Sequence, residues 1–477
     1  MEHRPETVAP SARRILTILG IALFLRVLVP IASVIAVGDA GVFLYPDSGS
    51  YLRPTEELLR TGRFANDDRP EIDRTPGYPM LLLPGIALGK PVLVTITLQV
   101  ILSVLTVFLV YRTSARVFQD EKTAAAAALL YSFEPLSILY TTLILTETLF
   151  TLLIVSFCFF LATYFRRQQA LSTLILAAVS LSCSVYVRPV SYYLPFIVSL
   201  VLLPVLLVRY KKLKHLLHVV AFLVVSVGLV GLWPVRNKIE TGYGGFSAIS
   251  DINLYFYQAA SVRAKVEGLP YLEVRRRMGY TDPDLYFAEH PEQLSWSDAR
   301  RYAFMGQEGA KTILRHPGVY AAVHMNGVVR ILFDPGSVDY LKIFGLYPAS
   351  GGILGKLADQ GLVSVVLGLL KNNPLVFWTQ LVLFALLATC YLLAVLGLLG
   401  RSCPNVWARI AVAAVIVYFV IVSAGPHSYS RFRHPAMPFF CVLAGCGCTW
   451  LLRRSIDSRP AIRDSDHRTV TGGEKIL

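Results

Sequence analysis

Long apolar runs, separated by short polar connections, dominate the chain. A helix needs about 20 residues to cross the hydrocarbon core of a bilayer, and about ten runs come close to that length. They cover residues 15–37, 91–110, 123–141, 143–165, 171–187, 192–208, 215–235, 374–400, 407–424 and 435–452. The pattern predicts an α-helical polytopic membrane protein with about ten transmembrane helices, within a range of about 9–12.

The remaining apolar features are weaker. The stretches 79–89 and 352–370 are expected to lie at the membrane interface or to re-enter the membrane. The first run follows two arginines, as a signal peptide would, but its length and the lack of a clear cleavage site favour a membrane anchor. Arg26 lies inside this run and is expected to have a helix-packing partner.

Basic residues in the short connections set the orientation, because cytoplasmic loops are enriched in Lys and Arg. With the N-terminus in the cytoplasm, the basic connections all fall on that side; they carry Arg112, Arg116, Lys122, Arg166, Arg167, Arg209, Lys211, Lys212, Lys214, Arg453 and Arg454. The long segments 38–78 and 236–373 then lie outside. They hold 21 of the 31 acidic residues and 20 of the 45 basic ones.

This topology predicts five parts. They are a cytoplasmic tail 1–14, an N-terminal transmembrane module 15–235 that contains the first external loop 38–78, an extracytoplasmic or interfacial region 236–373, a C-terminal transmembrane module 374–452 and a cytoplasmic tail 453–477.

Composition and charge exclude several classes of function. Hydrophobic residues make up 55% of the chain and charged residues only 16%. The net charge of +14 reflects mainly the basic cytoplasmic connections, so it does not indicate nucleic-acid binding. Seven cysteines show no Cys-x-x-Cys spacing that would indicate a zinc site or a disulfide framework. The usual loops of ATP-driven or dinucleotide-dependent enzymes are also missing.

Polar residues beside the apolar runs gather on the outer side of this topology. They are Asp73, Arg74, Glu134, Glu147, Arg188, Arg236, Arg431, Arg433 and His434. An acid inside a membrane span is costly unless it is paired or faces water. Four of these residues also have a simpler interpretation: Arg188 and Arg236 as interface anchors, and Asp73 and Arg74 as a surface ion pair. Together they indicate an anionic headgroup bound at the outer surface.

The location constrains the reaction, because the outer face has no pool of ATP or nucleotide-activated sugars. A transferase there needs an activated donor that arrives through the bilayer, and a polyprenyl-phosphate sugar meets this requirement. A carboxylate would take the proton of the acceptor hydroxyl. Arginines or a divalent metal would stabilise the departing phosphate.

The order of several short motifs points to a known family. An acid at Asp47 is followed by a short expected helix 48–60, then GRF, RTPGYP, TLILTETLF, YVRP and WPVRN. This order resembles the membrane glycosyltransferases of the C-type (GT-C) fold, in the bacterial branch similar to protein O-mannosyltransferases (glycosyltransferase family 39) and the lipid A aminoarabinose transferase. The resemblance covers about residues 15–340. It implies a GT-C-like fold with interfacial helices in the first external loop, a mainly helical external domain, a bacterial plasma membrane and an extracytoplasmic site.

The resemblance also implies residue roles. Asp47 would be the catalytic base, although Asp39 is an alternative and Asp47 is also a good helix N-cap. Asp73, Glu147 and Glu134 would be supporting acids. The family commonly has a second acid where this chain has Ser48, so a divalent metal on Asp47 and Asp73 remains open, and no other cofactor is implied. Donor phosphate or substrate would be bound by Arg74, Tyr78, Arg188, Arg431 and Arg433.

The predicted function is therefore inverting transfer of a sugar from a polyprenyl-phosphate donor to a hydroxyl of a lipid, glycan or protein, with membrane lipids as further partners. Two alternatives remain. A ligase or polymerase acting on a polyprenyl-diphosphate glycan would also need external basic residues. A lipid or glycolipid flippase would usually show paired inverted halves, which this chain does not display.

Overall fold

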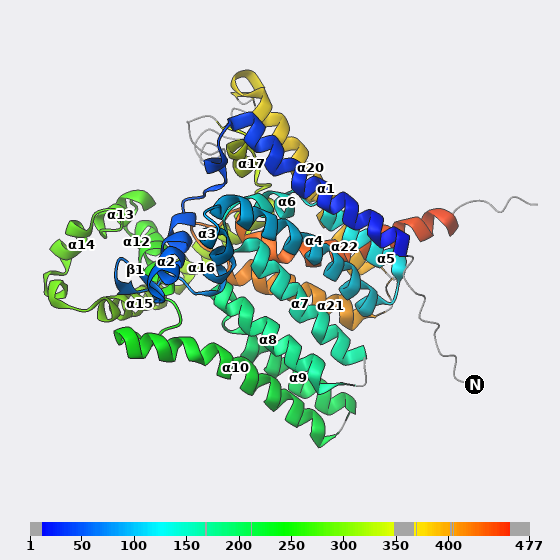
Figure 1. Cartoon of the computed structure of the whole chain (residues 1–477), viewed down its shortest axis with the longest axis horizontal. Helices are drawn as coiled ribbons and strands as arrows, with labels where there is room; N and C mark the ends of the chain where they lie inside the picture. Colours follow the sequence, from blue (N-terminus) through cyan, green and yellow to red (C-terminus); the bar gives the residue numbers. More distant parts are fainter. Residues whose placement is uncertain are drawn as a thin grey trace, which may run out of the picture.

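The computed structural model describes residues 12–166, 169–210, 212–347, 367–368, 370–400, 403 and 405–457. In these ranges the secondary structure is helical apart from one short hairpin (Figure 1). Most of the expected interfacial stretch 352–370 lies outside the described residues.

Nine of the ten predicted spans correspond to single helices. They are α1 (Ala12–Val37), α4 (Pro91–Phe118), α7 (Glu147–Arg166), α8 (Leu171–Val187), α9 (Leu194–Tyr210), α10 (Leu213–Thr241), α20 (Pro374–Leu399), α21 (Val406–Val422) and α22 (Met437–Asp457). Seven helical stretches among the described residues are long and apolar enough to cross a bilayer. Large apolar side chains on these helices face outward, as they do in lipid. The chain is an integral membrane protein.

The remaining predicted span, residues 123–141, is not a single helix. The expectation of one continuous helix there is wrong. The chain forms α5 (Glu121–Ser132) and α6 (Pro135–Thr142) instead. Pro135 lacks the amide proton that an unbroken helix would use, so the helix ends before it. The Glu134 carboxylate then accepts hydrogen bonds from the amides of Leu136 (3.1 Å) and Ser137 (2.6 Å) and caps the new helix.

Arg26 stabilises this break from the neighbouring helix α1. Its side chain is fully buried, and its guanidinium donates to the carbonyl of Ser132 at 3.1 Å and to the hydroxyl of Ser137 at 2.9 Å. Its Nε donates to the hydroxyl of Ser103 on α4 at 2.6 Å. The expected helix-packing role of Arg26 is confirmed, because one side chain satisfies polar groups of three elements.

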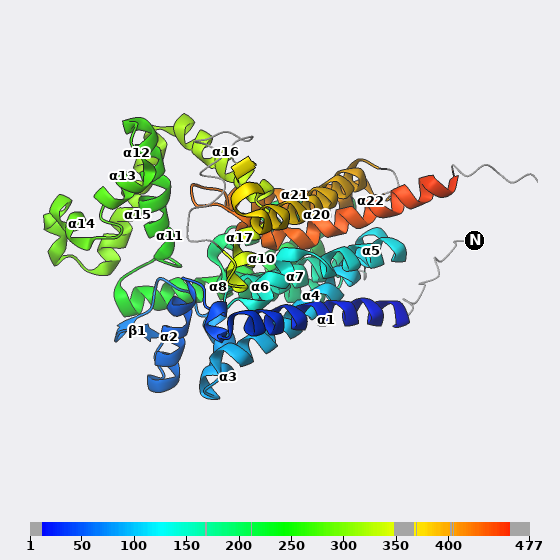
Figure 2. The same cartoon turned by 90° about the horizontal axis from the view of Figure 1, so that it is seen from above.

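The helices form one bundle with its polar parts at the two ends. α7 packs between α4 and α8, and α22 packs against α20 and α5. The described ends of the chain, at the start of α1 and the end of α22, lie at one end of the bundle (Figure 2). The helices of the external region project from the opposite end.

The predicted first external loop begins after α1 and contains short helices and the hairpin. These elements are η1 (Ala40–Phe43), α2 (Ser48–Thr61), the strands β1 (Ala65–Asn66) and β2 (Arg69–Pro70), and α3 (Gly77–Ala87). The hairpin pairs Ala65 with Pro70 and Asn66 with Arg69. Helix α2 ends one residue later than the sequence predicts.

The second external region is mainly helical, as expected. Its elements are α11 (Ile249–Asn253), the π-helix η3 (Leu254–Ala259), α12 (Ala260–Glu267), α13 (Tyr271–Arg277), α14 (Pro283–Glu289), η4 (Pro291–Ser295), α15 (Asp298–Arg315), α16 (Pro317–Phe333) and α17 (Ser337–Ile343). A small hydrophobic core of aliphatic and aromatic residues packs η3 and α12 to α15 together. The last external turn is η5 (Ser430–Ala436), which leads into α22.

Gly77 brings the start of α3 directly against the end of α8. A Cβ added at Gly77 would lie 2.6 Å from both the backbone carbon and the carbonyl oxygen of Tyr186. Real Cβ atoms are not found so close to backbone, and backbone cannot move aside as a flexible side chain can. This contact sets the distance between the segment that carries Arg74 and the segment that carries Arg188.

Substitution Gly77→Ala is therefore expected to lower the free energy of unfolding by about 1–3 kcal/mol, the usual cost of overpacking. Thermal unfolding of the purified protein in detergent measures the effect. Gly228→Ala in α10 is the matched control, because nothing lies within 4 Å of its added Cβ. Equal unfolding temperatures for the two variants would contradict the proposed steric constraint.

Candidate active site

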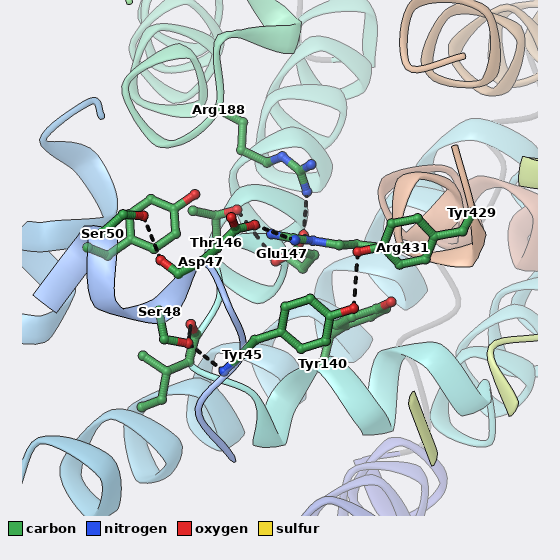
Figure 3. A network of polar contacts seen from close by, with 12 residues as sticks. Tyr45, Asp47, Ser48, Ser50, Tyr140, Thr146, Glu147, Arg188, Tyr429 and Arg431 are labelled. Atoms are coloured by element: carbon green, nitrogen blue, oxygen red, sulfur yellow. Dashed lines mark hydrogen bonds and ion pairs between the residues drawn. The ribbon is translucent and has the colours of Figure 1, made fainter. Parts of the chain in front are cut away.

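Two carboxylates and three arginines form one connected network, of which Figure 3 shows Asp47, Glu147, Arg188 and Arg431. Asp47 Oδ2 lies 2.6 Å from Nη1 of Arg431, and its Oδ1 lies 3.2 Å from Nη2 of Arg74. Arg431 also pairs through Nε with Oε1 of Glu147. The same oxygen of Glu147 lies 2.7 Å from Nη1 of Arg188. Each of these five residues was named as a site residue from the sequence, and the structure brings all five together.

The ends of several elements position these side chains. Asp47 directly precedes α2, Arg74 lies in the turn before α3, and Arg188 follows α8. Glu147 is the first residue of α7, where the helix dipole favours a negative charge. Arg431 lies in η5, 384 residues from Asp47 in the sequence. The network therefore joins the first external loop to the last external turn.

Exposure rises from Glu147 through Arg431 to Asp47. The side chain of Glu147 is 0% exposed, that of Arg431 is 7% exposed and that of Asp47 is 35% exposed. A buried carboxylate needs charged partners to offset its loss of hydration, which Glu147 finds in two arginines. Asp47 is the acid of the network that solvent or a substrate can reach.

The charge balance of the network favours anions. Three arginines face two carboxylates, which leaves a net charge of +1 within the network. Burial by itself would raise the pKa of Asp47, but Arg431 and Arg74 outweigh it and hold that pKa below its ordinary value. Asp47 is therefore ionised at neutral pH and held by two cations.

Two simpler interpretations of these residues are wrong. Asp47 occupies the N-cap position of α2, but its side chain makes no capping hydrogen bond. Arg74 does not pair with its neighbour Asp73; its guanidinium contacts Asp47 and, at 3.3 Å, the hydroxyl of Tyr51. The guanidinium also lies over the ring of Tyr51, 4.8 Å from its centroid.

Asp73 lies beside the network, close to a second acid, Glu71. Oε1 of Glu71 accepts the backbone amides of Asp73 (2.6 Å) and Arg74 (2.8 Å) and so fixes the turn. Arg236, another residue of the predicted outer group, donates to the carbonyl of Glu71 at 2.7 Å. Oδ1 of Asp73 is buried and has no hydrogen-bond partner among the described residues. Burial, followed by repulsion from Glu71, raises the pKa of Asp73 to about 6.

Three predicted site residues lie in the framework instead. Arg433 donates to the carbonyls of Ile331 and Asp334 (2.7 Å for Asp334) at the end of α16. Tyr78 is fully buried and donates to Gln99 at 2.9 Å. Glu134 caps α6. The structure does not bring these three side chains into the network.

Sequence reasoning missed a group of hydroxyls beside Arg431. The hydroxyl of Tyr45 lies 3.3 Å from that of Tyr429 and donates to Asp339 at 3.3 Å, while Tyr140 donates to the other oxygen of Asp339 at 3.2 Å. Burial raises the pKa of Asp339. The Arg431 guanidinium lies over the Tyr45 ring (Figure 3). The sequence offered one signal for these hydroxyls: Tyr45 lies two residues before Asp47.

The donor set does not fit a resident divalent metal. The described residues contain no group of three or more His, Cys, Asp or Glu side chains that could hold a metal ion. Both oxygens of Asp47 already contact arginines. Ser48, at the position of the family's second acid, instead donates to the carbonyl of Ile144 at 2.8 Å and accepts the amide of Tyr45. No step of the proposed reaction is therefore assigned to a metal.

Comparison with known families gives a match within the N-terminal module. Residues 73–233 match the family model described as dolichyl-phosphate-mannose-protein mannosyltransferase. The matched region, about a third of the chain, includes Arg74, Glu147 and Arg188, while Asp47 and Arg431 lie outside it. No curated protein matches the chain.

Solved structures show the likeness in fold. The archaeal oligosaccharyltransferase AglB from Archaeoglobus fulgidus, in complex with an inhibitory peptide and a dolichol-phosphate, is similar with a TM-score of 0.50 and 14% identity over 95% of this chain and 52% of that chain. Its apo form gives a TM-score of 0.50 and 13% identity over 94% and 52% of the two chains. ArnT from Cupriavidus metallidurans bound to undecaprenyl phosphate gives 0.40 and 15% over 93% and 79%.

The chain therefore spans about half the length of the archaeal oligosaccharyltransferase structures. At such low identity the likeness concerns the fold, and the GT-C-like fold expected from the sequence is confirmed.

The exposure gradient predicts unequal effects of neutralising the two acids. Glu147→Gln leaves two arginines without their buried partner and is expected to lower the free energy of unfolding by about 3–5 kcal/mol. Asp47→Asn removes a partly exposed charge and is expected to cost less than about 1 kcal/mol. Thermal and denaturant unfolding in detergent compare them. A larger loss for Asp47→Asn would contradict the assignment of Glu147 as the buried anchor.

The raised pKa of Asp73 predicts a pH-dependent stability. The folded chain holds the Asp73 proton more tightly than the unfolded chain, so stability falls as pH rises from about 4 to about 6 and the cost persists above. Asp73→Asn should raise the unfolding temperature at pH 7 and change it little at pH 4. Unfolding scans across this pH range provide the measurement, and a gain of the same size at both pH values would contradict it.

Proposed function

We propose that the chain is an inverting membrane glycosyltransferase that moves a sugar from a polyprenyl-phosphate donor to an acceptor hydroxyl outside the cytoplasm. The observation that carries this proposal is the partly exposed Asp47 carboxylate held between Arg74 and Arg431. The family model of residues 73–233 is that of mannosyltransferases with a dolichyl-phosphate-linked donor, and the similar archaeal transferase was solved with a dolichol-phosphate. Both support a lipid-linked donor.

The arginines provide the phosphate site. A donor phosphate needs cations in a place that a polyprenyl tail can reach from the bilayer. Arg188 directly follows α8, and Glu147 is the first residue of α7. The network therefore lies at the termini of these two membrane helices. Arginine donates two parallel hydrogen bonds to a phosphate, which suits both binding of the donor and stabilisation of the leaving group.

The reaction is a single displacement. Asp47 accepts the proton of the acceptor hydroxyl while that oxygen forms a bond to the anomeric carbon from the face opposite the phosphate. The bond between the anomeric carbon and the phosphate oxygen breaks, and its electron pair leaves with the polyprenyl phosphate. Arg74 and Arg431 offset the negative charge that develops on that oxygen. The configuration at the anomeric carbon is thereby inverted.

Donor binding also prepares the base. In the free protein Arg74 and Arg431 depress the pKa of Asp47, which makes its carboxylate a weak base. A phosphate that attracts the same guanidiniums weakens their pull on Asp47, so its pKa rises towards its ordinary value. The carboxylate becomes a better proton acceptor when the donor is in place, and premature chemistry is avoided.

The proposed orientation rests on what lies at each end of the bundle. The basic connections lie at the same end of the bundle as the described chain ends, and α2 and α3, beside which the network residues lie, are towards the other end (Figure 2). Under the positive-inside rule, the network faces the extracytoplasmic side of a bacterial plasma membrane, and both termini are cytoplasmic. The acceptor hydroxyl belongs to a lipid, a glycan or a protein.

The central prediction concerns Asp47. With radiolabelled polyprenyl-phosphate sugars as donors and a membrane extract as acceptor pool, Asp47→Asn should lower the rate of transfer about 100-fold or more, the usual contribution of a general base. Asp39→Asn is the matched control, because Asp39 is exposed and accepts the amide of Gly41 at 2.8 Å outside the network. Its rate should stay within about twofold of the unchanged protein.

One result would exclude the proposed base, and two others would contradict the function. Transfer that persists in Asp47→Asn would exclude this residue as the base. Activity with polyprenyl-diphosphate glycans alone would favour a ligase or polymerase. Movement of labelled lipid across liposomes, with no transfer from any donor, would favour a flippase.

A further inference from the structure

A cavity with polar and apolar walls lies between the external helices and the membrane module. Its volume is about 560 Å³, and it is bounded by α12, α16 and the segment that follows α21. Two basic side chains line it, Lys265 and Arg330, and none of its lining residues is acidic. Ser261, Tyr271 and Asn326 add neutral hydrogen-bonding groups, and the remaining lining residues are apolar or glycine.

This cavity lies at the level where a membrane helix ends. Helix α21 ends at Val422, and the ring nitrogen Nε2 of His324 on α16 lies 2.9 Å from the carbonyl oxygen of Ile421. The backbones of Gly327 and Gly425 also meet closely, since a Cβ on Gly327 would lie 2.4 Å from the amide nitrogen of Gly425. Figure 2 shows α16 between α12 and α21. The cavity therefore lies beside the end of the apolar helix α21, where a spanning helix meets the membrane surface.

Two large apolar side chains, Leu269 and Val323, lie within the lining. Four exposed apolar side chains are chain neighbours of lining residues: Val266, Leu272, Met325 and Val329. Exposed apolar groups beside basic groups at this depth suit an amphiphile with a negative headgroup. A water-soluble anion would leave the apolar groups unused.

We propose that this cavity binds the phosphate-bearing headgroup of an anionic membrane lipid, with Lys265 and Arg330 as its charged contacts and the apolar lining residues Leu269 and Val323 against its acyl chains. Arg330 donates to the carbonyl of Pro426 at 3.1 Å through Nη1, and its other N–H groups are available to a phosphate. The cavity is separate from the network around Asp47, and this binding does not depend on the proposed transfer reaction.

A fixed positive cluster lies next to the cavity. The Arg275 guanidinium lies 3.6 Å from the ring centroid of Tyr280 and 4.2 Å from that of Tyr257, and it contacts Nε2 of His427 at 3.3 Å. Burial, followed by repulsion from Arg275 and Arg330, lowers the pKa of His427 to about 4. His427 is therefore neutral at pH 7 and the local charge comes from arginine, which adds to the attraction for an anion.

Binding at this place would restrain the segment that carries Arg431. Gly425 and Pro426 line the cavity, and the chain continues through Tyr429, which contacts Tyr45, to Arg431. A lipid that bridges α12, α16 and this segment stabilises their arrangement. Lipid binding should therefore raise the unfolding temperature of the whole protein.

The test titrates the purified full-length protein in detergent with phosphatidylglycerol and, separately, with phosphatidylcholine, and counts bound lipid by native mass spectrometry. Phosphatidylglycerol should bind at least about tenfold more tightly than phosphatidylcholine, and the double variant Lys265→Ala/Arg330→Ala should lose this difference. The control variant Lys238→Ala/Arg315→Ala removes the same charge from exposed positions outside the cavity and should keep it.

Several outcomes would overturn the proposal. Equal binding of the two lipids, or unchanged selectivity in the cavity variant, would exclude a headgroup site on Lys265 and Arg330. Displacement of the lipid by millimolar inorganic phosphate, together with equal stabilisation by phosphate alone, would assign the cavity to a free anion. If the double variant fails to fold, the single exposed change Lys265→Gln serves in its place, and selectivity unchanged in Lys265→Gln counts against the proposal.

Discussion

The buried carboxylate of Glu147 is the constraint on which the site depends. A fully buried acid at the end of a membrane helix is stable only beside positive charge, and Arg188 and Arg431 provide it. These arginines come from the end of α8 and from η5, so the need to neutralise one side chain fixes the relative positions of three elements. Arg431 then has a guanidinium nitrogen left for Asp47. The buried carboxylate and its arginines thus position Asp47, the partly exposed acid of the network.

Close backbone contacts bring the same segments together from the other side. Gly77 allows the turn that carries Arg74 to touch the end of α8, next to Arg188. Glu71 holds that turn through two backbone amides. Arg74 can then reach Asp47 while it stacks on Tyr51. Steric fit and charge pairing act on the same few residues, and this explains why sequence motifs far apart in the chain form one compact site.

Much of this arrangement could be predicted from the sequence. Nine of the ten apolar runs correspond to single helices. Polar residues beside those runs included four members of the network, and the family resemblance added Asp47. The break at Glu134–Pro135 was missed because the apolar pattern continues across it, although proline beside an acid is a helix-starting signal. Asp339 and Tyr140 were missed for a different reason: their contacts join residues 199 positions apart, and neither local pattern differs from that of ordinary polar and aromatic residues.

The groups to which the charged residues bind distinguish those that hold the fold together from those of the candidate site. Arg26 and Arg433 bind backbone carbonyls, and Glu134 binds backbone amides. Those partners belong to helix ends, and removing them would expose unsatisfied peptide groups in a dry environment, so a substrate cannot exchange with them. Arg74 and Arg431 instead bind the carboxylate of Asp47, which is partly exposed and can regain hydration when released. A phosphate can therefore compete for these arginines at low cost. The sequence shows a charge beside an apolar run in all of these cases, and the identity of the partner decides which charges are available for chemistry.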